Sequence, residues 1–416
     1  MTTRLGKILC VTSNLPRWQG DSTTPFVLHL AQDLQELGWH VDILAPHAPN
    51  AAEQEILNGV HIERFRYLWP KSSQTVCYQG GALINLRKNP LNKVKLPALV
   101  GAELAAVTKR VLARDYDIIH SHWLLPQGFT GMLAQKLKPI PHVVTVHGGD
   151  VFGLRGQILS IAKRAVLNTA SAVTVNSSVT ENEVMQLTPN LDTVHRIPMG
   201  VSTQLPNSGY KQLTESIRQR YCKGKGPLVL FVGRLVEEKG VEDFLRAIVI
   251  VRKQFPEVRA LIAGAGQDRT YFERLSISLK LDDCVKFSGW VTPEEIPAYY
   301  LAADIFVGPS RRAENGWVEA QGLTFLEAMT SGIPVIATRL GGVVDSVLHE
   351  ETGLLVDERS PQQIADALHR LLSDKNLRQQ ISRNGRKMVD SQFSRQASAE
   401  TFSSLFKELC QQSKIN

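Results

Sequence analysis

The sequence predicts an α/β protein made of two Rossmann-like domains, each a parallel β-sheet covered by helices. Three observations lead to this prediction. The chain has 416 residues, too many for one ordinary core and suited to two domains of about 200 residues each. Apolar runs with strand character alternate with amphipathic stretches along the chain, a pattern that favours parallel sheets. The alternation restarts after a polar stretch at residues 202–225.

In the first half, residues 7–12 form an apolar run typical of a buried strand. Thr24 and Pro25 suit the N-cap and first position of a helix, and Gly38 suits its C-terminal stop. A strand at 41–45 then completes a β-α-β unit. Further strands of this half are predicted at 117–120, 142–146 and 172–175.

In the second half, a strand at 228–232 precedes a helix at 241–255, and Ser360 with Pro361 caps a helix through Leu372. The remaining strands are predicted at 258–263, 285–288, 304–307 and 334–337. We place the domains at 1–205 and 206–396, with a C-terminal helix at 397–416 that packs back on the first domain. Ligands bind beyond the carboxyl ends of strands in open α/β sheets, so we expect the two parallel sheets to face each other across a ligand-binding cleft.

Composition excludes several classes of protein. No apolar run reaches the 18 residues of a membrane span, since the longest, at 96–107, carries Glu103. The first nine residues lack the features of a signal peptide. The five cysteines are odd in number and never spaced as CxxC, which argues against a disulfide framework or a cysteine-ligated metal. We therefore expect a cytoplasmic protein.

Two glutamates eight residues apart, Glu319 and Glu327, are the strongest chemical signal. They bracket a glycine-containing turn that opens a helix near Gly322, whose free N–H groups would bind an anion. Glu327 would lie inside this helix and could accept two hydroxyl hydrogen bonds. A solvated residue or a salt-bridge partner is the alternative, which the glycine turn and the apolar neighbours disfavour. The candidate ligand-binding residues of this segment are Ala320, Gln321, Gly322, Leu323, Thr324 and Glu327.

A second motif runs from Gly233 and Arg234 to Lys239 and Gly240, after the strand at 228–232. An arginine and a lysine five residues apart at the carboxyl end of a strand can converge on a diphosphate. Surface charge on a connecting loop is the alternative, and the flanking glycines favour the functional interpretation.

The third motif, His147, Gly148 and Asp150, follows the strand at 142–146, and its glycines would let a ligand approach closely. His120 and His122 end the preceding strand, where packing is a better interpretation than a metal pair because no third ligand is evident. The loop at 16–25, with Gly20, could contact donor phosphates or be an inert surface loop.

Together, these motifs and their order resemble glycosyltransferase family 4, over nearly the whole chain. The segments 120–128 and 198–201 are similar to a bacterial branch that acts on lipids or surface polysaccharides. Two features depart from the family. Residues 23–26 replace the frequent Gly-Gly of the first loop, which puts phosphate contacts there in doubt. Ser202 stands where relatives carry aspartate, and nothing catalytic depends on it.

The resemblance implies the two-domain GT-B fold, with the acceptor on the first domain and the nucleotide sugar on the second. It implies a retaining hexosyltransferase that needs no metal or other cofactor and uses a UDP- or GDP-type sugar donor. Arg234 and Lys239 would stabilise the leaving diphosphate, Glu319 and His147 would hold sugar hydroxyls, and Glu327 the ribose. The base would lie near Trp290 and Val291, against the backbone.

The net charge of +7 is concentrated in residues 64–110, where nine Lys/Arg face one acid, Glu103. Aromatic residues are interleaved with these cations, but no nucleic-acid-binding motif accompanies them, and we expect no nucleic acid partner. An anionic membrane surface or a lipid-linked acceptor fits better. We therefore expect peripheral attachment to the inner face of the plasma membrane, with a solvated basic surface as the alternative.

Three other functions stay open. A sugar epimerase or phosphorylase could share the fold, and a nucleotide-sugar-binding regulatory protein could share the motifs without catalysis. A dehydrogenase is disfavoured, because the loop after the first strand lacks GxGxxG.

Overall fold

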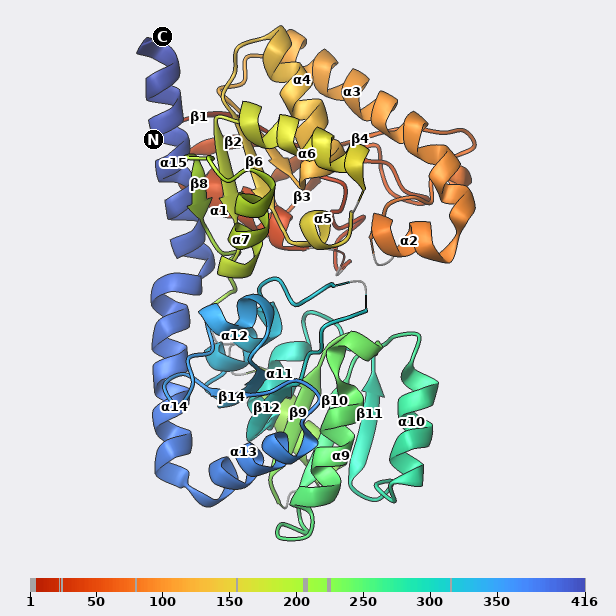
Figure 1. Cartoon of the computed structure of the whole chain (residues 1–416), viewed down its shortest axis with the longest axis vertical. Helices are drawn as coiled ribbons and strands as arrows, with labels where there is room; N and C mark the ends of the chain where they lie inside the picture. Colours follow the sequence, from red (N-terminus) through yellow and green to blue (C-terminus); the bar gives the residue numbers. More distant parts are fainter. Residues whose placement is uncertain are drawn as a thin grey trace. The chain divides into compact units, whose positions relative to one another are not determined.

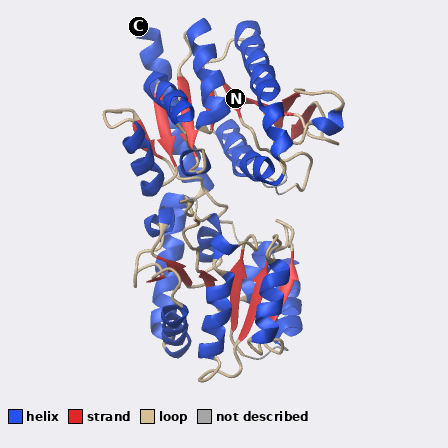
Figure 2. Cartoon of the chain, turned by 45° about the vertical axis from the view of Figure 1, so that its right-hand side comes forward, coloured by secondary structure: helices blue, strands red, loops and turns tan. Residues whose placement is uncertain are grey.

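The computed structural model describes residues 5–21, 23, 25–78, 81–154, 156–204, 209–222, 226–314 and 316–415. The chain forms two compact units: unit 1 comprises Met1–Gly200 and Arg395–Asn416, and unit 2 comprises Val201–Ser394. Each unit is built on one mostly parallel sheet with helices packed against it (Figure 1 and Figure 2). The prediction of an α/β fold with two parallel-sheet units is therefore confirmed. The predicted boundary at 205 falls outside the described residues.

Unit 1 has a sheet in the strand order β3-β4-β2-β1-β5-β6-β7-β8, parallel except that β3 is antiparallel to β4. Its strands are β1 (Gly6–Val11), β2 (Trp39–Pro46), β3 (Gln54–Leu57), β4 (Val60–Phe65), β5 (Ile118–His122), β6 (His142–Val146), β7 (Ala172–Val175) and β8 (Val194–Arg196). Its helices are α1 (Pro25–Glu36), α2 (Ala82–Lys88), α3 (Leu96–Ala113), α4 (Phe129–Leu137), α5 (Gly149–Phe152), α6 (Gln157–Thr169), α7 (Ser178–Leu187) and α15 (Arg395–Ile415). Short helical turns are η1 (Lys71–Ser73), η2 (Pro90–Lys95) and η3 (Leu124–Gly128).

Unit 2 has a fully parallel sheet in the order β11-β10-β9-β12-β13-β14. Its strands are β9 (Leu228–Val232), β10 (Arg259–Ala263), β11 (Val285–Gly289), β12 (Ile305–Gly308), β13 (Val335–Thr338) and β14 (Leu354–Val356). Its helices are α8 (Gly209–Cys222), α9 (Val241–Val251), α10 (Arg269–Ser278), α11 (Ile296–Ala302), α12 (Leu323–Thr330), α13 (Pro361–Ser373) and α14 (Lys375–Met388). Its short turns are η4 (Glu237–Lys239), η5 (Gly341–Asp345) and η6 (Val389–Phe393).

The sheet of unit 2 buries both of its faces, because successive side chains of a strand point to opposite sides. In β9, Val229 and Phe231 pack with the apolar residues of α9 and α13. Leu228 and Leu230 pack on the other face, with residues of α8, α11 and α12. The continuous apolar run that predicted a buried strand at 228–232 thus serves two cores.

Two local elements were not predicted, and one helix start differs from the prediction in its capping bond. The polar stretch at 202–225 contains α8, because Ile217 and Cys222 (4% and 3% exposed) bury an apolar face of a helix whose other positions are mostly polar. The β3–β4 hairpin was not predicted, although Asn58 and Gly59, with φ of 49° and 83°, form the Asn-Gly turn that hairpins favour. Ser360 is the N-cap of α13 and Pro361 its first residue, as predicted, although the Ser360 side chain makes no capping hydrogen bond. Thr24, the expected cap of α1, lies outside the described residues.

The last helix, α15, belongs to unit 1, where it packs on α1. Trp39 Nε1 donates a hydrogen bond to Ser403 Oγ at 2.9 Å, which fixes α15 beside β2. None of the described helices combines the length and the apolar character that a membrane span requires.

Candidate active site

In unit 2, the loop after β9 carries the Gly-Arg…Lys-Gly motif. Gly240 ends this loop with φ of 70°, and a Cβ atom there would lie 1.8 Å from the carbonyl oxygen of Pro309, so the position requires glycine. Arg234 follows Gly233 and is exposed, and among the described residues its side chain has no ion pair or hydrogen bond. Its guanidinium is therefore available to an anionic ligand at the carboxyl end of β9.

Lys239 and Glu319, predicted separately, are neighbours in the structure. The Lys239 ammonium forms an ion pair with the Glu319 carboxylate and lies 5.3 Å from the ring centroid of Trp317. The Glu319 carbonyl oxygen accepts a hydrogen bond from the Gly342 N–H at 2.8 Å. A Cβ atom at Gly341 would lie 2.2 Å from the same carbonyl oxygen. The two glycines thus hold the backbone that presents Glu319.

The start of α12 matches the predicted anion site in position. Gly322 is the N-cap, with φ of 79°, and no side chain caps the helix there. Gln321 is buried, whereas Ala320, Leu323 and Thr324 are half-buried along this turn. The N–H groups of this first turn are therefore open to a ligand rather than to a capping side chain.

Glu327 lies one turn into α12 and has a partner that the sequence did not indicate. The Tyr300 hydroxyl, on α11, donates a hydrogen bond to Glu327 Oε2 at 2.8 Å. Burial raises the pKa of Glu327 to about 7, and the hydrogen bond from Tyr300 acts in the opposite direction. Glu327 therefore changes charge near neutral pH.

Trp290 and Val291 follow β11, the edge strand of the unit 2 sheet. Trp290 is 58% exposed, while Val291 packs against the core formed by α8 and α11. The Gly289 carbonyl accepts a hydrogen bond from the Gly264 N–H at 2.8 Å, which joins this segment to the loop after β10. The structure thus places these residues at the same end of the sheet as Arg234.

In unit 1, His147 follows β6 within a cluster of aromatic rings. Its Nε2 lies 2.9 Å from Nδ1 of His122, and the two rings stack with centroids 5.2 Å apart. Trp123 and Phe26 cover it further, at 4.8 and 5.1 Å between centroids. Burial lowers the pKa of His147 to about 3, so the imidazole is neutral at physiological pH. Gly148, with φ of 93°, makes the turn into α5.

Other polar residues near His147 form hydrogen bonds that stabilise the structure. Asp150 is 2% exposed, and its Oδ2 accepts a hydrogen bond from the Leu124 N–H at 2.9 Å. Burial raises its pKa above the usual range. His120 bonds Thr145 Oγ1 at 2.7 Å. No group of three metal-ligating side chains occurs among the described residues. Asp150 and His120 thus connect neighbouring segments at the ends of strands. A contact between Asp150 and a ligand stays a prediction.

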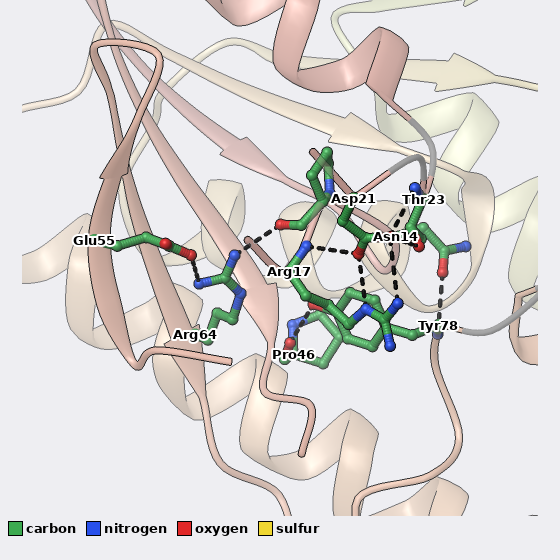
Figure 3. Close-up of polar contacts among 9 residues, drawn as sticks. Asn14, Arg17, Asp21, Thr23, Pro46, Glu55, Arg64 and Tyr78 are labelled. Atoms are coloured by element: carbon green, nitrogen blue, oxygen red, sulfur yellow. Dashed lines mark hydrogen bonds and ion pairs between the residues drawn. The ribbon is translucent and has the colours of Figure 1, made fainter. Parts of the chain in front are cut away.

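Gly20 lies in the loop between β1 and α1, which Figure 3 shows. The Asp21 N–H donates to the Trp18 carbonyl at 3.1 Å, and Gly20 takes φ of 84° in this turn. That conformation is the one a type II turn requires of its third residue. A Cβ atom at Gly20 would meet nothing within 4 Å, so its Cα faces open space.

Sequence reasoning missed Tyr300, Trp317 and Gly341. Tyr300 lies in an apolar helical run, and nothing in that pattern indicates a partner for its hydroxyl. The Gly341-Gly342 pair was a usable signal, because adjacent glycines after a strand indicate close backbone approach.

Comparison with known proteins matches two family models. Residues 24–205 match the model described as Glycosyltransferase Family 4, and residues 214–388 match the model described as Glycosyl transferases group 1. The chain is 32% identical over 397 residues to a D-inositol 3-phosphate glycosyltransferase of Corynebacterium jeikeium, covering 87% of this chain and 91% of the relative. It is 31% identical over 252 residues to a GDP-mannose-dependent alpha-(1-6)-phosphatidylinositol monomannoside mannosyltransferase of Mycobacterium tuberculosis, covering 60% and 65%.

Solved structures resemble the whole chain. A sucrose-phosphate synthase from Thermosynechococcus elongatus has a TM-score of 0.76 at 25% identity, covering 97% of this chain and 99% of the other. HepE from Anabaena in complex with UDP has a TM-score of 0.73 at 18% identity, covering 97% and 100%. The second likeness supports the fold alone.

Proposed function

Since this chain belongs to glycosyltransferase family 4, we propose that it is a retaining hexosyltransferase that uses a UDP- or GDP-type sugar. The acceptor is a saccharide or a lipid-linked acceptor, in polysaccharide or glycolipid synthesis. One observation carries the donor assignment: the exposed Arg234, which pairs with none of the described residues, lies in the same loop as Lys239, whose ammonium forms an ion pair with Glu319 from the other motif. Two motifs 80 residues apart thus converge at one end of the unit 2 sheet.

Each donor group has a proposed partner. Arg234 and Lys239 bind the diphosphate and stabilise its charge as it leaves, aided by the N–H groups at the start of α12. Glu327 accepts the ribose hydroxyls, and the base lies against the segment of Trp290 and Val291. Glu319 and His147 hold the hydroxyls of the transferred sugar, to which a neutral imidazole can donate or accept a hydrogen bond.

The reaction keeps the anomeric configuration because the acceptor hydroxyl attacks from the face that the diphosphate leaves. The leaving phosphate oxygen accepts the proton of that hydroxyl. In this mechanism the protein orients the reactants and stabilises developing charge.

Nucleotide binding tests the donor site. Calorimetry of the purified chain against UDP-, GDP- and ADP-sugars is expected to show binding of one nucleotide class, lost in Arg234→Ala and weakened in Glu327→Ala. Arg252→Ala is the matched control, since Arg252 lies beyond the opposite end of α9 and pairs with Asp283. A folded protein that binds none of the donors contradicts the proposal.

The stereochemistry has its own test. Proton NMR of the freshly formed product is expected to show the same anomeric configuration as the donor. A product of opposite configuration rejects the retaining mechanism and leaves the donor site unaffected.

Unit 1 also has features of a membrane-binding surface, and we include peripheral attachment in the proposal. Four of the nine cations at 64–110 pair with the acids at 53, 55 and 63, so the segment is less basic than its sequence indicates. The exposed cations that form no ion pair with described residues are Arg87, Lys88, Lys93 and Lys109. In the same segment, Trp69, Leu91 and Val94 are 86%, 71% and 78% exposed. Lys95 Nζ, 3.0 Å from the Ser73 carbonyl, ties η2 to η1.

Vesicle flotation tests this attachment. The chain is expected to float with phosphatidylcholine vesicles that contain phosphatidylglycerol, and a variant with both Leu91→Ser and Val94→Ser is expected to remain in solution. The matched control replaces Ile158 and Ile161 by serine, which are 82% and 65% exposed on α6. If the Leu91/Val94 variant floats as well as the Ile158/Ile161 control, or if the chain floats without the anionic lipid, this surface is not the membrane-binding site.

A further inference from the structure

Two adjoining cavities lie in unit 1, where the loops after β1, β2 and β4 meet. Their volumes are about 250 Å³ and 480 Å³, and both are lined by Pro49 and Asn50. The first is also lined by Arg17 and Trp18, and the second by Lys71 and Ser72. All three loops leave carboxyl ends of strands, where α/β sheets bind ligands. None of the residues in the described donor motifs of unit 2 takes part.

Buried hydrogen bonds hold these loops in place, as Figure 3 shows. Arg64 is 2% exposed and donates from Nη2 to the Pro16 carbonyl and from Nη1 to the Ala52 carbonyl, both at 2.8 Å. The Tyr78 hydroxyl donates to the Pro46 carbonyl at 2.5 Å, and the Tyr78 N–H to Asn14 Oδ1 at 3.2 Å. The cavities are therefore formed before a ligand binds, which reduces the entropy cost of binding.

The charges that line the cavities are already compensated. Arg17 forms a two-pronged ion pair with Asp21, at 2.7 and 3.2 Å. Burial alone would raise the pKa of Asp21, but the hydrogen bonds from Arg17 and Thr23 and the charge of Arg17 together lower that pKa. Lys71 Nζ lies 2.9 Å from the Glu53 carboxylate. A phosphate would have to compete with these carboxylates, whereas an uncharged ligand would not.

Trp18 gives the first cavity an amphipathic wall. The Arg17 guanidinium lies 4.2 Å from the ring centroid and covers one face of the indole, yet Trp18 remains 42% exposed. A pyranose has an apolar face of C–H groups that packs on an aromatic ring, and a rim of hydroxyls that needs hydrogen-bonding partners. The exposed amide of Asn50 and the exposed hydroxyl of Ser72 supply such partners.

We propose that these cavities are the acceptor subsite, and that it takes an uncharged pyranose stacked on Trp18. This assignment rests on the proposed function and deepens it. It separates this chain from its relative in Corynebacterium jeikeium, whose name specifies a phosphorylated acceptor.

Saturation-transfer NMR tests the proposal on the full chain. The probes are the methyl α-glycosides of glucose, mannose and galactose, beside glucose 6-phosphate and mannose 6-phosphate. We expect signal from at least one neutral glycoside, stronger than that from either phosphate, and reduced about fivefold in Trp18→Ala. Trp18→Phe, which keeps an aromatic ring, is expected to retain most of the signal. Tyr271→Ala, which removes a ring that is 52% exposed in unit 2, is the control and is expected to match the wild type.

Hydrolysis of the nucleotide sugar, measured without an acceptor, separates this proposal from the donor assignment. We expect hydrolysis in the wild type, and a circular dichroism spectrum and thermal midpoint equal to those of the wild type show that Trp18→Ala is folded. Absence of hydrolysis and of nucleotide binding in the wild type contradicts the proposed function. If the donor is hydrolysed, three results overturn the acceptor subsite alone: no signal from any neutral glycoside, full signal in Trp18→Ala, or stronger signal from the phosphates.

Discussion

Replacing Tyr300 by phenylalanine tests the proposed contact of Glu327 with the ribose. Tyr300 is 1% exposed, and its hydroxyl donates the 2.8 Å hydrogen bond to Glu327 Oε2. Burial raises the pKa of Glu327 to about 7, and this hydrogen bond opposes the rise. Only the ionised carboxylate can accept two ribose hydroxyls without giving up an oxygen to its own proton. Nucleotide affinity is therefore expected to increase as the pH rises through 7.

The structure gives the size of the effect. A hydrogen bond to a charged group contributes about 1.5–3 kcal/mol, and we take the lower end because Glu327 is partly exposed. Since one pKa unit corresponds to about 1.4 kcal/mol, Tyr300→Phe should raise the pKa of Glu327 by about one unit. At pH 7 the ionised fraction would fall from about one half to about one tenth, which weakens nucleotide binding about fivefold.

Calorimetric titration of the nucleotide between pH 6 and 9 measures this shift. The midpoint of the affinity profile is expected to move to higher pH in Tyr300→Phe and to vanish in Glu327→Gln. Tyr299→Phe is the matched control, because Tyr299 precedes Tyr300 on α11 and its hydroxyl interacts with Tyr221. An unchanged midpoint in Tyr300→Phe would refute the role assigned to this hydrogen bond.

Three further predictions concern single residues. Burial lowers the pKa of His142 to about 3 from its ordinary 6.5. The unfolded chain therefore binds more protons between these two pH values, and the free energy of unfolding falls as the pH falls from 6.5 to 3. In urea unfolding of His142→Gln, the change of this free energy with pH should be smaller by about 1.4 kcal/mol per pH unit. Gly341→Ala would place a Cβ 2.2 Å from the Glu319 carbonyl oxygen and should lower both kcat and Tm; an unchanged kcat would show that the position of Glu319 does not matter. His122→Gln removes the imidazole bonded to His147 and should lower kcat about tenfold while the Kd of the nucleotide stays constant. An altered Kd would show that the substitution disturbs the fold beyond this contact.

The fold could be predicted because the central strands of each sheet are buried on both faces and most of them are continuous apolar runs in the sequence. The run at 228–232, for example, matches β9 residue for residue. The same reasoning fails where an element buries only a narrow stripe. In α8, Ile217 and Cys222 are the buried positions in a helix of low mean hydropathy, so the pattern resembles a linker. Periodicity thus detects elements in proportion to the apolar area that they bury.

The candidate site shows a comparable limit. The carboxyl ends of parallel strands can be located from sequence, and this alone brought Arg234 and Glu319 under consideration. The contacts between side chains then depend on how α11 and α12 pack. No local sequence pattern predicts the hydrogen bond from Tyr300 to Glu327. The pairing of His122 with His147 is a similar case, because it joins the ends of two adjacent strands.

The paired glutamates illustrate why spacing alone does not assign roles. Glu319 and Glu327 are the same residue type on one short segment, yet their surroundings differ. Glu319 has the Lys239 ammonium beside it, and so its negative charge has a permanent electrostatic partner. Among the described residues, the side chain of Glu327 is bonded to the neutral Tyr300 hydroxyl, and burial disfavours its charge. The first arrangement suits a carboxylate that must stay ionised beside a diphosphate, because the lysine can bind both. The second suits a carboxylate that becomes fully useful when hydroxyl donors arrive, since each ribose hydroxyl replaces solvation that burial has removed. The two roles therefore follow from the two environments.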